Sequence, residues 1–112
     1  MKKVALTDVK PYEAAGHFGM VALKLHGKEE TGSKNFWMGF SHFLPSGGAE
    51  MAASPAEKIY FVTEGAVTVK TETEEIIIEK HDSVYIPENE ARYIVNHTNM
   101  PASMLVICNY PD

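Results

Sequence analysis

The feature that most constrains this chain is a series of short, strand-like runs separated by turn residues at close intervals. Residues 67–72 alternate apolar and polar side chains, as a half-exposed strand does, and no stretch keeps a helical period beyond about two turns. The predicted strands are 20–26, 35–44, 58–63, 66–72, 75–79, 83–86, 91–96 and 102–109, with a break at 45–48. This pattern predicts an all-β fold in which antiparallel strands form a closed or double-sheet barrel of the jelly-roll type.

Length, charge and cysteine content narrow the function classes. The 112 residues, 45% of them apolar, suffice for a single domain, residues 1–112, in which residues 1–17 form an N-terminal arm. The net charge of −5 argues against nucleic acid as a partner, and no apolar run approaches the ~20 residues that a membrane span needs. The single Cys108 and the absence of a signal peptide pattern predict a cytoplasmic protein.

Two of the predicted strands are apolar on both faces. Residues 35–40 and 76–78 have no polar side left to face water. In so small a protein, a strand of this kind is covered either by a second sheet or by another chain. We therefore expect a homodimer, to which the N-terminal arm could contribute by adding residues 4–6 to a neighbouring sheet edge.

Two segments, 57–65 and 81–96, carry the spacing of a known pair of motifs. Gly65 closes the first segment, and Pro87 and Asn96 stand at the required places of the second. The chain thereby resembles the cupin family, whose motifs have the forms G-x5-H-x-H-x3,4-E-x6-G and G-x5-P-x-G-x2-H-x3-N. The resemblance covers about half of the chain and implies a double-stranded β-helix, the jelly-roll barrel of that family.

The resemblance also identifies where the family holds a divalent metal, with three histidines and one glutamate. The corresponding positions here are Ala52 and Ser54 (or Met51 and Ala53), Lys58, and Arg92. An alanine has no lone pair to donate, and two cationic side chains repel a metal ion. We therefore expect no metal and no other cofactor at this site. Two glycine positions of the motifs also differ, being His81 and Asn89; an asparagine tolerates a left-handed backbone better than a histidine does.

The same substitutions suggest a different ligand. Strand alternation puts Lys58, Tyr60 and Val62 on one face of their strand. If the family geometry holds, Lys58 and Arg92 point into the barrel together, where neither keeps its charge without a counter-ion. That counter-ion is either an internal carboxylate (Glu50, Glu57 or Glu90) or a small anionic metabolite, most simply one that bears a carboxylate. In the second case, we expect hydrogen bonds from two further residues and an apolar wall from two others. These four are Tyr60 and Asn96, and Met51 and Trp37.

Three functions follow from the sequence. The first is a metal-free barrel that binds a small anion, with isomerase, lyase or cyclase activity as a further option if Lys58 or Tyr60 transfers a proton. The second is a divalent-metal enzyme with relocated ligands, for which His42, Glu50 and Glu57 are the candidates. The third is a non-catalytic sensor or structural homodimer.

Overall fold

The computed structural model describes residues 1–111 and is built almost entirely of strands. One 3-10 helix, η1 (Leu6–Asp8), precedes them. The strands are β1 (His17–His26), β2 (Phe36–Ala52), β3 (Lys58–Glu64), β4 (Ala66–Lys70), β5 (Glu75–Glu79), β6 (Ser83–Ile86), β7 (Arg92–Val95) and β8 (Ala102–Asn109). Within residues 1–111, no helix has the length and apolar character needed to cross a membrane.

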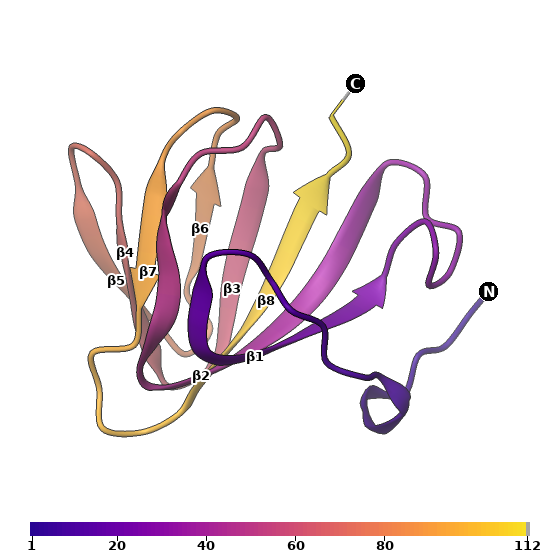
Figure 1. Ribbon diagram of the computed structural model, residues 1–112, viewed down its shortest axis with the longest axis horizontal. Coiled ribbons are helices and arrows are strands. Elements are labelled where there is room, and N and C mark those ends of the chain that lie inside the picture. The colour runs from indigo at the N-terminus through magenta and orange to yellow at the C-terminus, as the bar shows by residue number, and fades with distance from the viewer. Residues whose placement is uncertain (112) are drawn as a thin grey trace.

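The strands pair in the order β5-β4-β7-β2-β8-β3-β6, and β1 pairs with β2. Every pairing is antiparallel. The long strand β2 belongs to both walls of the barrel: residues 36–43 pair with β8, and residues 48–52 pair with β7. Figure 1 shows the resulting curved sheet, which folds back on itself around one interior. The predicted jelly-roll barrel is confirmed.

The strand pattern also predicted most of the element positions, with one clear error. The predicted break at residues 45–48 is wrong, because β2 continues through it. Gly47 and Gly48 do not form a turn but let neighbouring backbones come close. A Cβ at Gly47 would collide with the carbonyl of Gly19, and a Cβ at Gly48 would collide with that of Ile94.

The N-terminal arm folds back onto its own chain. The Tyr12 N–H donates to the Ala22 carbonyl at 3.0 Å, and the Glu50 N–H donates to the Gly16 carbonyl at 2.8 Å. Gly16 has a φ of 70°, which allows the chain to reverse before β1 begins. Residues 12–17 therefore lie across an open side of the barrel, as the indigo segment in Figure 1 shows, and are called the lid segment below.

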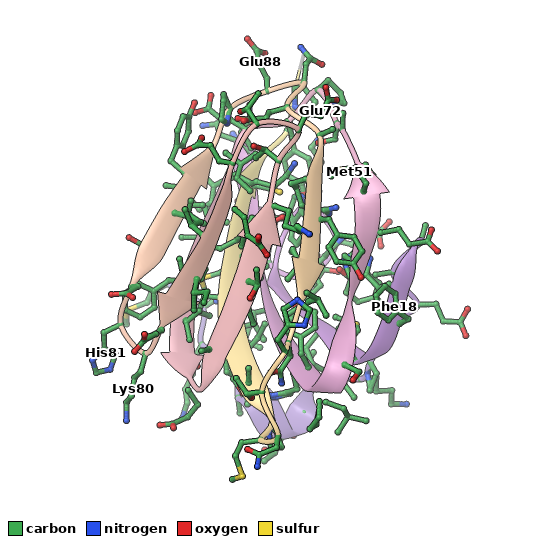
Figure 2. The ribbon with its side chains drawn as sticks, turned by 90° about the vertical axis from the view of Figure 1, so that its left-hand side faces the viewer. Phe18, Met51, Glu72, Lys80, His81 and Glu88 are labelled. Carbon is green, nitrogen blue, oxygen red and sulfur yellow. The ribbon has the colours of Figure 1, made fainter. Side chains whose placement is uncertain are left out.

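Both residues that replace motif glycines adopt a glycine-like backbone. His81 has a φ of 72° and Asn89 a φ of 63°. The Asn89 turn therefore keeps its shape, as predicted, and His81 does so as well despite its larger side chain. Figure 2 places His81 at one end of the barrel and Glu88, the neighbour of Asn89, at the other. Both turns thus have the positive φ that a glycine adopts readily.

Inward-facing residues form the core. On β3, Lys58, Tyr60 and Val62 are buried, whereas Ile59 between them is exposed. This alternation agrees with the prediction from the sequence. A cluster of buried apolar residues around Phe43, Val62, Ile94 and Met104 fills much of the interior.

Candidate functional site

Strands β3 and β7 place two cationic side chains and a tyrosine next to one another inside the barrel. The Arg92 Nε donates a hydrogen bond of 2.8 Å to the Tyr60 hydroxyl, and its Nη1 donates one of 3.0 Å to the Glu50 carbonyl. The Lys58 Nζ donates to the Ser54 hydroxyl at 3.1 Å. Lys58 is only 7% exposed. Lys58 and Arg92 are called the cation pair below.

The electrostatics of the cation pair are unfavourable without an anion. Burial lowers the pKa of Lys58, and the positive charge of Arg92 lowers it further. Burial raises the pKa of Tyr60, although the charge of Arg92 and its hydrogen bond partly oppose this rise. Burial also raises the pKa of the Cys108 thiol, which stays protonated and unreactive.

The internal carboxylates considered as counter-ions are not paired with these cations. Among residues 1–111, the ion pairs within 4.0 Å are Lys70 with Glu75 and Lys80 with Glu64. Glu50 offers Arg92 a backbone carbonyl rather than its carboxylate. Glu57 accepts a hydrogen bond from the Tyr85 hydroxyl at 3.2 Å instead. Among the described residues, no carboxylate therefore forms an ion pair with Lys58 or Arg92.

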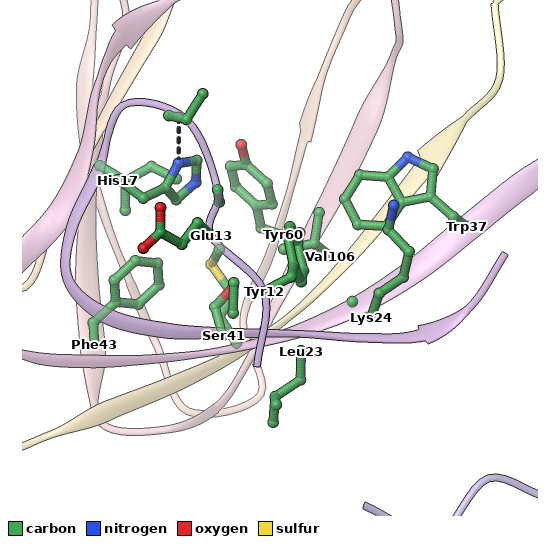
Figure 3. A pocket seen from close by; sticks show the side chains of 16 residues that line it. Tyr12, Glu13, His17, Leu23, Lys24, Trp37, Ser41, Phe43, Tyr60 and Val106 are labelled. Atoms are coloured by element: carbon green, nitrogen blue, oxygen red, sulfur yellow. Dashed lines mark hydrogen bonds between the residues drawn. The ribbon is translucent and has the colours of Figure 1, made fainter. Parts of the chain in front are cut away.

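A cavity of ≈ 340 Å³ includes Tyr60, the hydrogen-bond partner of Arg92, in its wall, although neither Lys58 nor Arg92 lines it. Trp37, Phe43 and Tyr60 contribute aromatic rings to its wall, and Ser41 contributes a hydroxyl. The lid segment covers it and adds Glu13 and His17 (Figure 3). The His17 Nδ1 lies 2.9 Å from the Ala15 carbonyl, which holds this ring against the lid backbone. A cavity of this kind, mostly apolar with a few polar groups, is the usual form of a small-molecule site.

One more lysine closes the side of this cavity. The Lys24 Nζ lies 5.0 Å from the centroid of the Trp37 ring and 5.4 Å from that of Tyr12. These distances are within the range of cation–π contacts, which hold the lysine between the two rings. The Tyr12 ring thereby connects the lid segment to β1 and β2.

Several of these residues were missed by the sequence reasoning. Ser41 could have been found, because it shares the inward face of β2 with Trp37. Glu13, His17 and Lys24 gave no signal, since they reach the cavity through the fold-back of the N-terminal arm. The prediction for that arm concerned residues 4–6 and a neighbouring sheet edge, and it did not extend to residues 12–17, which cover the barrel of their own chain.

Two of the residues expected to contact ligand lie elsewhere. Met51 is 47% exposed near the end of β2 (Figure 2) and is not part of the cavity wall. Asn96 is fully buried, but its amide binds the protein itself: Nδ2 donates to the carbonyls of Phe43 and Met100, and Oδ1 accepts from Thr98. Asn96 thus closes the loop between β7 and β8, and its expected role in ligand binding is a wrong reading of a structural position.

The side chains at the family's metal positions do not fit a cation. Lys58 and Arg92 are close enough for the charge of one to lower the pKa of the other, so a metal ion there would meet two positive charges. The relocated ligands do not converge either. His42 Nδ1 lies 2.8 Å from the Ser103 hydroxyl, and Glu57 binds Tyr85. In the part of the chain that the structure describes, no three His, Cys, Asp or Glu residues are grouped as a metal site.

Comparisons with known proteins agree with this architecture. The family model described as "Cupin domain" matches residues 39–108. A Mycobacterium tuberculosis protein named beta-D-galactosidase Rv1717 is 32% identical over 111 residues, which cover 99% of this chain and 96% of that protein.

Solved structures are similar at lower identity. The polyketide cyclase RemF of Streptomyces resistomycificus has a TM-score of 0.86 and 21% identity, over 97% of this chain and 79% of that chain. A cupin-superfamily sugar phosphate isomerase of Silicibacter pomeroyi has a TM-score of 0.82 and 21% identity, over 97% of this chain and 76% of that chain. At such identities the likeness shows the shared fold and not a shared reaction.

Proposed function

This chain belongs to the cupin family, and from that premise we propose that it binds a small anionic metabolite inside its barrel without a metal ion. The observation that carries the proposal is the cation pair, which is held inside the barrel without a carboxylate partner within residues 1–111. The two positive charges repel each other in this partly buried site, and an anion between them would relieve that repulsion. A carboxylate or phosphate group of a ligand would supply that charge.

The residues around the cation pair support a specific mode of binding. Arg92 uses Nε and Nη1 in the hydrogen bonds described above, which leaves other donors of its guanidinium for an anion. The remainder of the ligand would occupy the cavity, where Trp37 and Phe43 provide apolar contacts and Ser41 and Tyr60 provide hydroxyl groups. The site therefore suits a small, hydroxylated acid.

The same residues could also support proton transfer. Because burial raises its pKa, Tyr60 keeps its proton and can offer it in a hydrogen bond to a ligand oxygen, although it gives the proton up less readily than an ordinary tyrosine. Because its pKa is lowered, Lys58 gives up its proton more readily than an ordinary lysine. We include a metal-independent isomerase, lyase or cyclase step in the proposal on these grounds.

We also propose a cytoplasmic location, since the free Cys108 is compatible with a reducing compartment.

Removal of either cation is expected to weaken anion binding about tenfold or more, because each charged hydrogen bond to a ligand contributes about 1.5–3 kcal/mol. We would titrate Lys58→Met and Arg92→Met by calorimetry with galacturonate, pyruvate, succinate and inorganic phosphate. Affinity of the wild type should also fall as pH rises through the lowered pKa of Lys58, since the anion binds the protonated amine. Lys58→Met should lose that part of the pH dependence.

The matched control is Lys80→Met, which removes the same charge at the far end of the barrel (Figure 2). Its affinity should equal that of the wild type. Unchanged binding in both cation-pair variants would reject the proposal. An equal loss in Lys80→Met would show that net charge, rather than the cation pair, attracts the anion.

A second candidate function is the hydrolysis of β-galactosides. It is favoured by the 32% identity to the protein named beta-D-galactosidase Rv1717 and by the carboxylate of Glu13 in the cavity wall. Glycoside hydrolysis needs an acid that protonates the leaving oxygen, a role that a carboxyl group fills in most such enzymes. We rank this function second because such enzymes commonly use two carboxylates. Among the described residues that line this cavity, Glu13 is the one that carries a carboxylate.

Release of nitrophenolate from 4-nitrophenyl β-D-galactopyranoside tests this candidate. If this candidate is correct, the wild type hydrolyses the substrate. The rate of hydrolysis should fall about 100-fold or more in Glu13→Gln, because the amide cannot donate the required proton. The control is Glu50→Gln, since Glu50 is a nearby carboxylate outside the cavity wall. No turnover by the wild type would eliminate this candidate and leave the anion-binding proposal standing.

A further inference from the structure

A third cation, Lys24, lies at the edge of the cavity under the lid segment. One row of paired residues crosses the barrel wall from β3 through β8 and β2 to β1, and all of its members line this cavity. The row consists of Tyr60, Val106, Gly39 and Lys24. The Tyr60 hydroxyl accepts the hydrogen bond from Arg92 at one end of the row, and Lys24 is the other end. The row therefore has a positive charge near each of its ends.

The Trp37 ring fixes the amine of Lys24 at the cavity wall. Gly39 has no side chain, and this ring occupies the space beside it: a Cβ at Gly39 would lie 2.9 Å from Cζ3 of Trp37. The Lys24 Nζ lies 5.0 Å from the centroid of the same ring, and Lys24 is partly buried. The cation–π contact thus holds the amine beside the cavity instead of leaving it free in bulk water.

The charge of Lys24 acts on the same part of the barrel as the cation pair. Cys108 is paired in register with both Lys58 and Trp37, so its thiol lies between the two cation positions. Burial raises the pKa of this thiol, and the charges of the cation pair and of Lys24 each oppose the rise. Among residues 1–111, no carboxylate lies within 4.0 Å of the Lys24 amine. Lys24 is therefore a further cation of this site without an ion-pair partner among those residues.

The two ends of the cavity differ in charge. Figure 3 shows Lys24 and Trp37 at one end and Glu13 and His17 at the other. A negatively charged group of a ligand is repelled by the Glu13 carboxylate and attracted by the Lys24 amine. At ≈ 340 Å³ the cavity is near the small end of the range for ligand pockets, about 300–1,000 Å³. The cavity therefore favours a small ligand that directs an anionic group toward Lys24.

We propose that Lys24 is a specificity-determining residue that binds a second anionic group of the ligand, and that the ligand class is therefore a short dianion, of which a dicarboxylate is the simplest form. This inference rests on the proposed function, because the first anionic group is the one that binds at the cation pair. It adds a preference for two anionic groups over one and assigns that preference to a residue outside both sequence motifs.

The spacing of the strands sets the length of such a ligand. Neighbouring strands lie ~4.8 Å apart, so the backbones of β3 and β1 are roughly 14 Å apart along the row. The Lys24 side chain and the pair formed by Tyr60 and Arg92 extend from the two ends of the row and shorten this gap. Val106 and Gly39, the small residues between them, leave room for a short carbon chain.

Calorimetry of the full chain tests the proposal by comparing each of four diacids with the monoacid of the same chain length. The pairs are malonate with propionate, succinate with butyrate, glutarate with valerate, and adipate with hexanoate. The wild type should bind at least one diacid about tenfold or more tightly than its monoacid, because the second carboxylate gains a charged hydrogen bond. Lys24→Met should lose this advantage and still bind the monoacid as the wild type does, which also shows that the variant is folded. Lys24→Arg keeps the charge and should keep most of the advantage.

The matched control is Lys28→Met, which removes a lysine whose Nζ lies 4.3 Å from the centroid of the Tyr110 ring, outside the cavity wall. It should bind both acids of each pair as the wild type does.

Two results would overturn the role of Lys24 and leave the proposed function standing. The first is a wild type that binds no diacid more tightly than its monoacid. The second is an equal loss of monoacid and diacid in Lys24→Met, since Lys24 would then act by holding Tyr12 of the lid segment. Absence of monoacid binding, or monoacid binding that persists in both Lys58→Met and Arg92→Met, would instead reject the proposed function and this inference with it.

Discussion

Replacement of Gly48 by alanine is expected to destabilise the protein by about 3 kcal/mol or more, or to prevent its folding. The new Cβ would collide with the Ile94 carbonyl oxygen and lie 2.8 Å from the carbonyl carbon and 2.9 Å from the Val95 Cα. These are backbone atoms of the paired strand β7, so no side-chain rotation relieves the contact. Since folded domains are stable by about 5–15 kcal/mol, a loss of this size is severe.

Urea denaturation of Gly48→Ala measures the effect, with Gly16→Ala as the control. Gly16 has a positive φ, but a Cβ there meets its nearest atom at 3.6 Å, so only the conformational cost of about 1 kcal/mol remains. Equal losses in the two variants would show that strand β7 can move away from β2. The close approach of these strands would then not be essential to the fold.

Asn96→Leu is expected to cost about 3 kcal/mol, although leucine is similar in size and more apolar. The Asn96 Nδ2 donates to the carbonyls of Phe43 and Met100 at 3.2 and 2.8 Å, and Oδ1 accepts from the Thr98 N–H at 2.9 Å. Leucine would leave the Phe43 carbonyl without this partner in a buried setting and would remove two partly buried bonds, to the Met100 carbonyl and the Thr98 N–H; each lost bond costs about 1–3 kcal/mol when its group stays unpaired. Urea denaturation should show a lower midpoint with an unchanged slope.

Thr98→Val provides a milder comparison in the same loop. The Thr98 hydroxyl donates to the Asn96 Oδ1 and accepts from the Met100 N–H, so its removal should cost about 1 kcal/mol. If Asn96→Leu lowers the free energy of unfolding no more than Thr98→Val does, water replaces the lost hydrogen bonds. The amide is then not needed to hold the loop.

The fold could be predicted because its signals are local. Strand alternation placed Lys58, Tyr60 and Val62 on the inward face of β3, and the structure agrees. The turns at Gly65 and Asn89 carry residues suited to their positive φ. Only β2 was divided wrongly, because paired glycines are typical of a turn and also of two backbones in close contact, and the sequence does not distinguish the two cases.

The site could be predicted only in part, because much of it comes from contacts between distant segments. The position of Arg92 in the second motif predicted that it lies in the barrel. Its hydrogen bond to Tyr60 became apparent only from the structure. Asn96 was placed by the same motif and wrongly given a ligand role, since spacing does not reveal which way an amide points. The contribution of Glu13 depends on the path of the lid segment, which has no periodic pattern.

The backbone of Glu50 connects two parts of the barrel that the ligand would meet separately. Its N–H holds the Gly16 carbonyl of the lid segment, and its carbonyl holds Nη1 of Arg92. An anion that draws the guanidinium toward itself competes with this carbonyl, and a lid that lifts away pulls on the same residue. If the proposed anion binds, entry past the lid segment and neutralisation of the cation pair would be thermodynamically linked through Glu50.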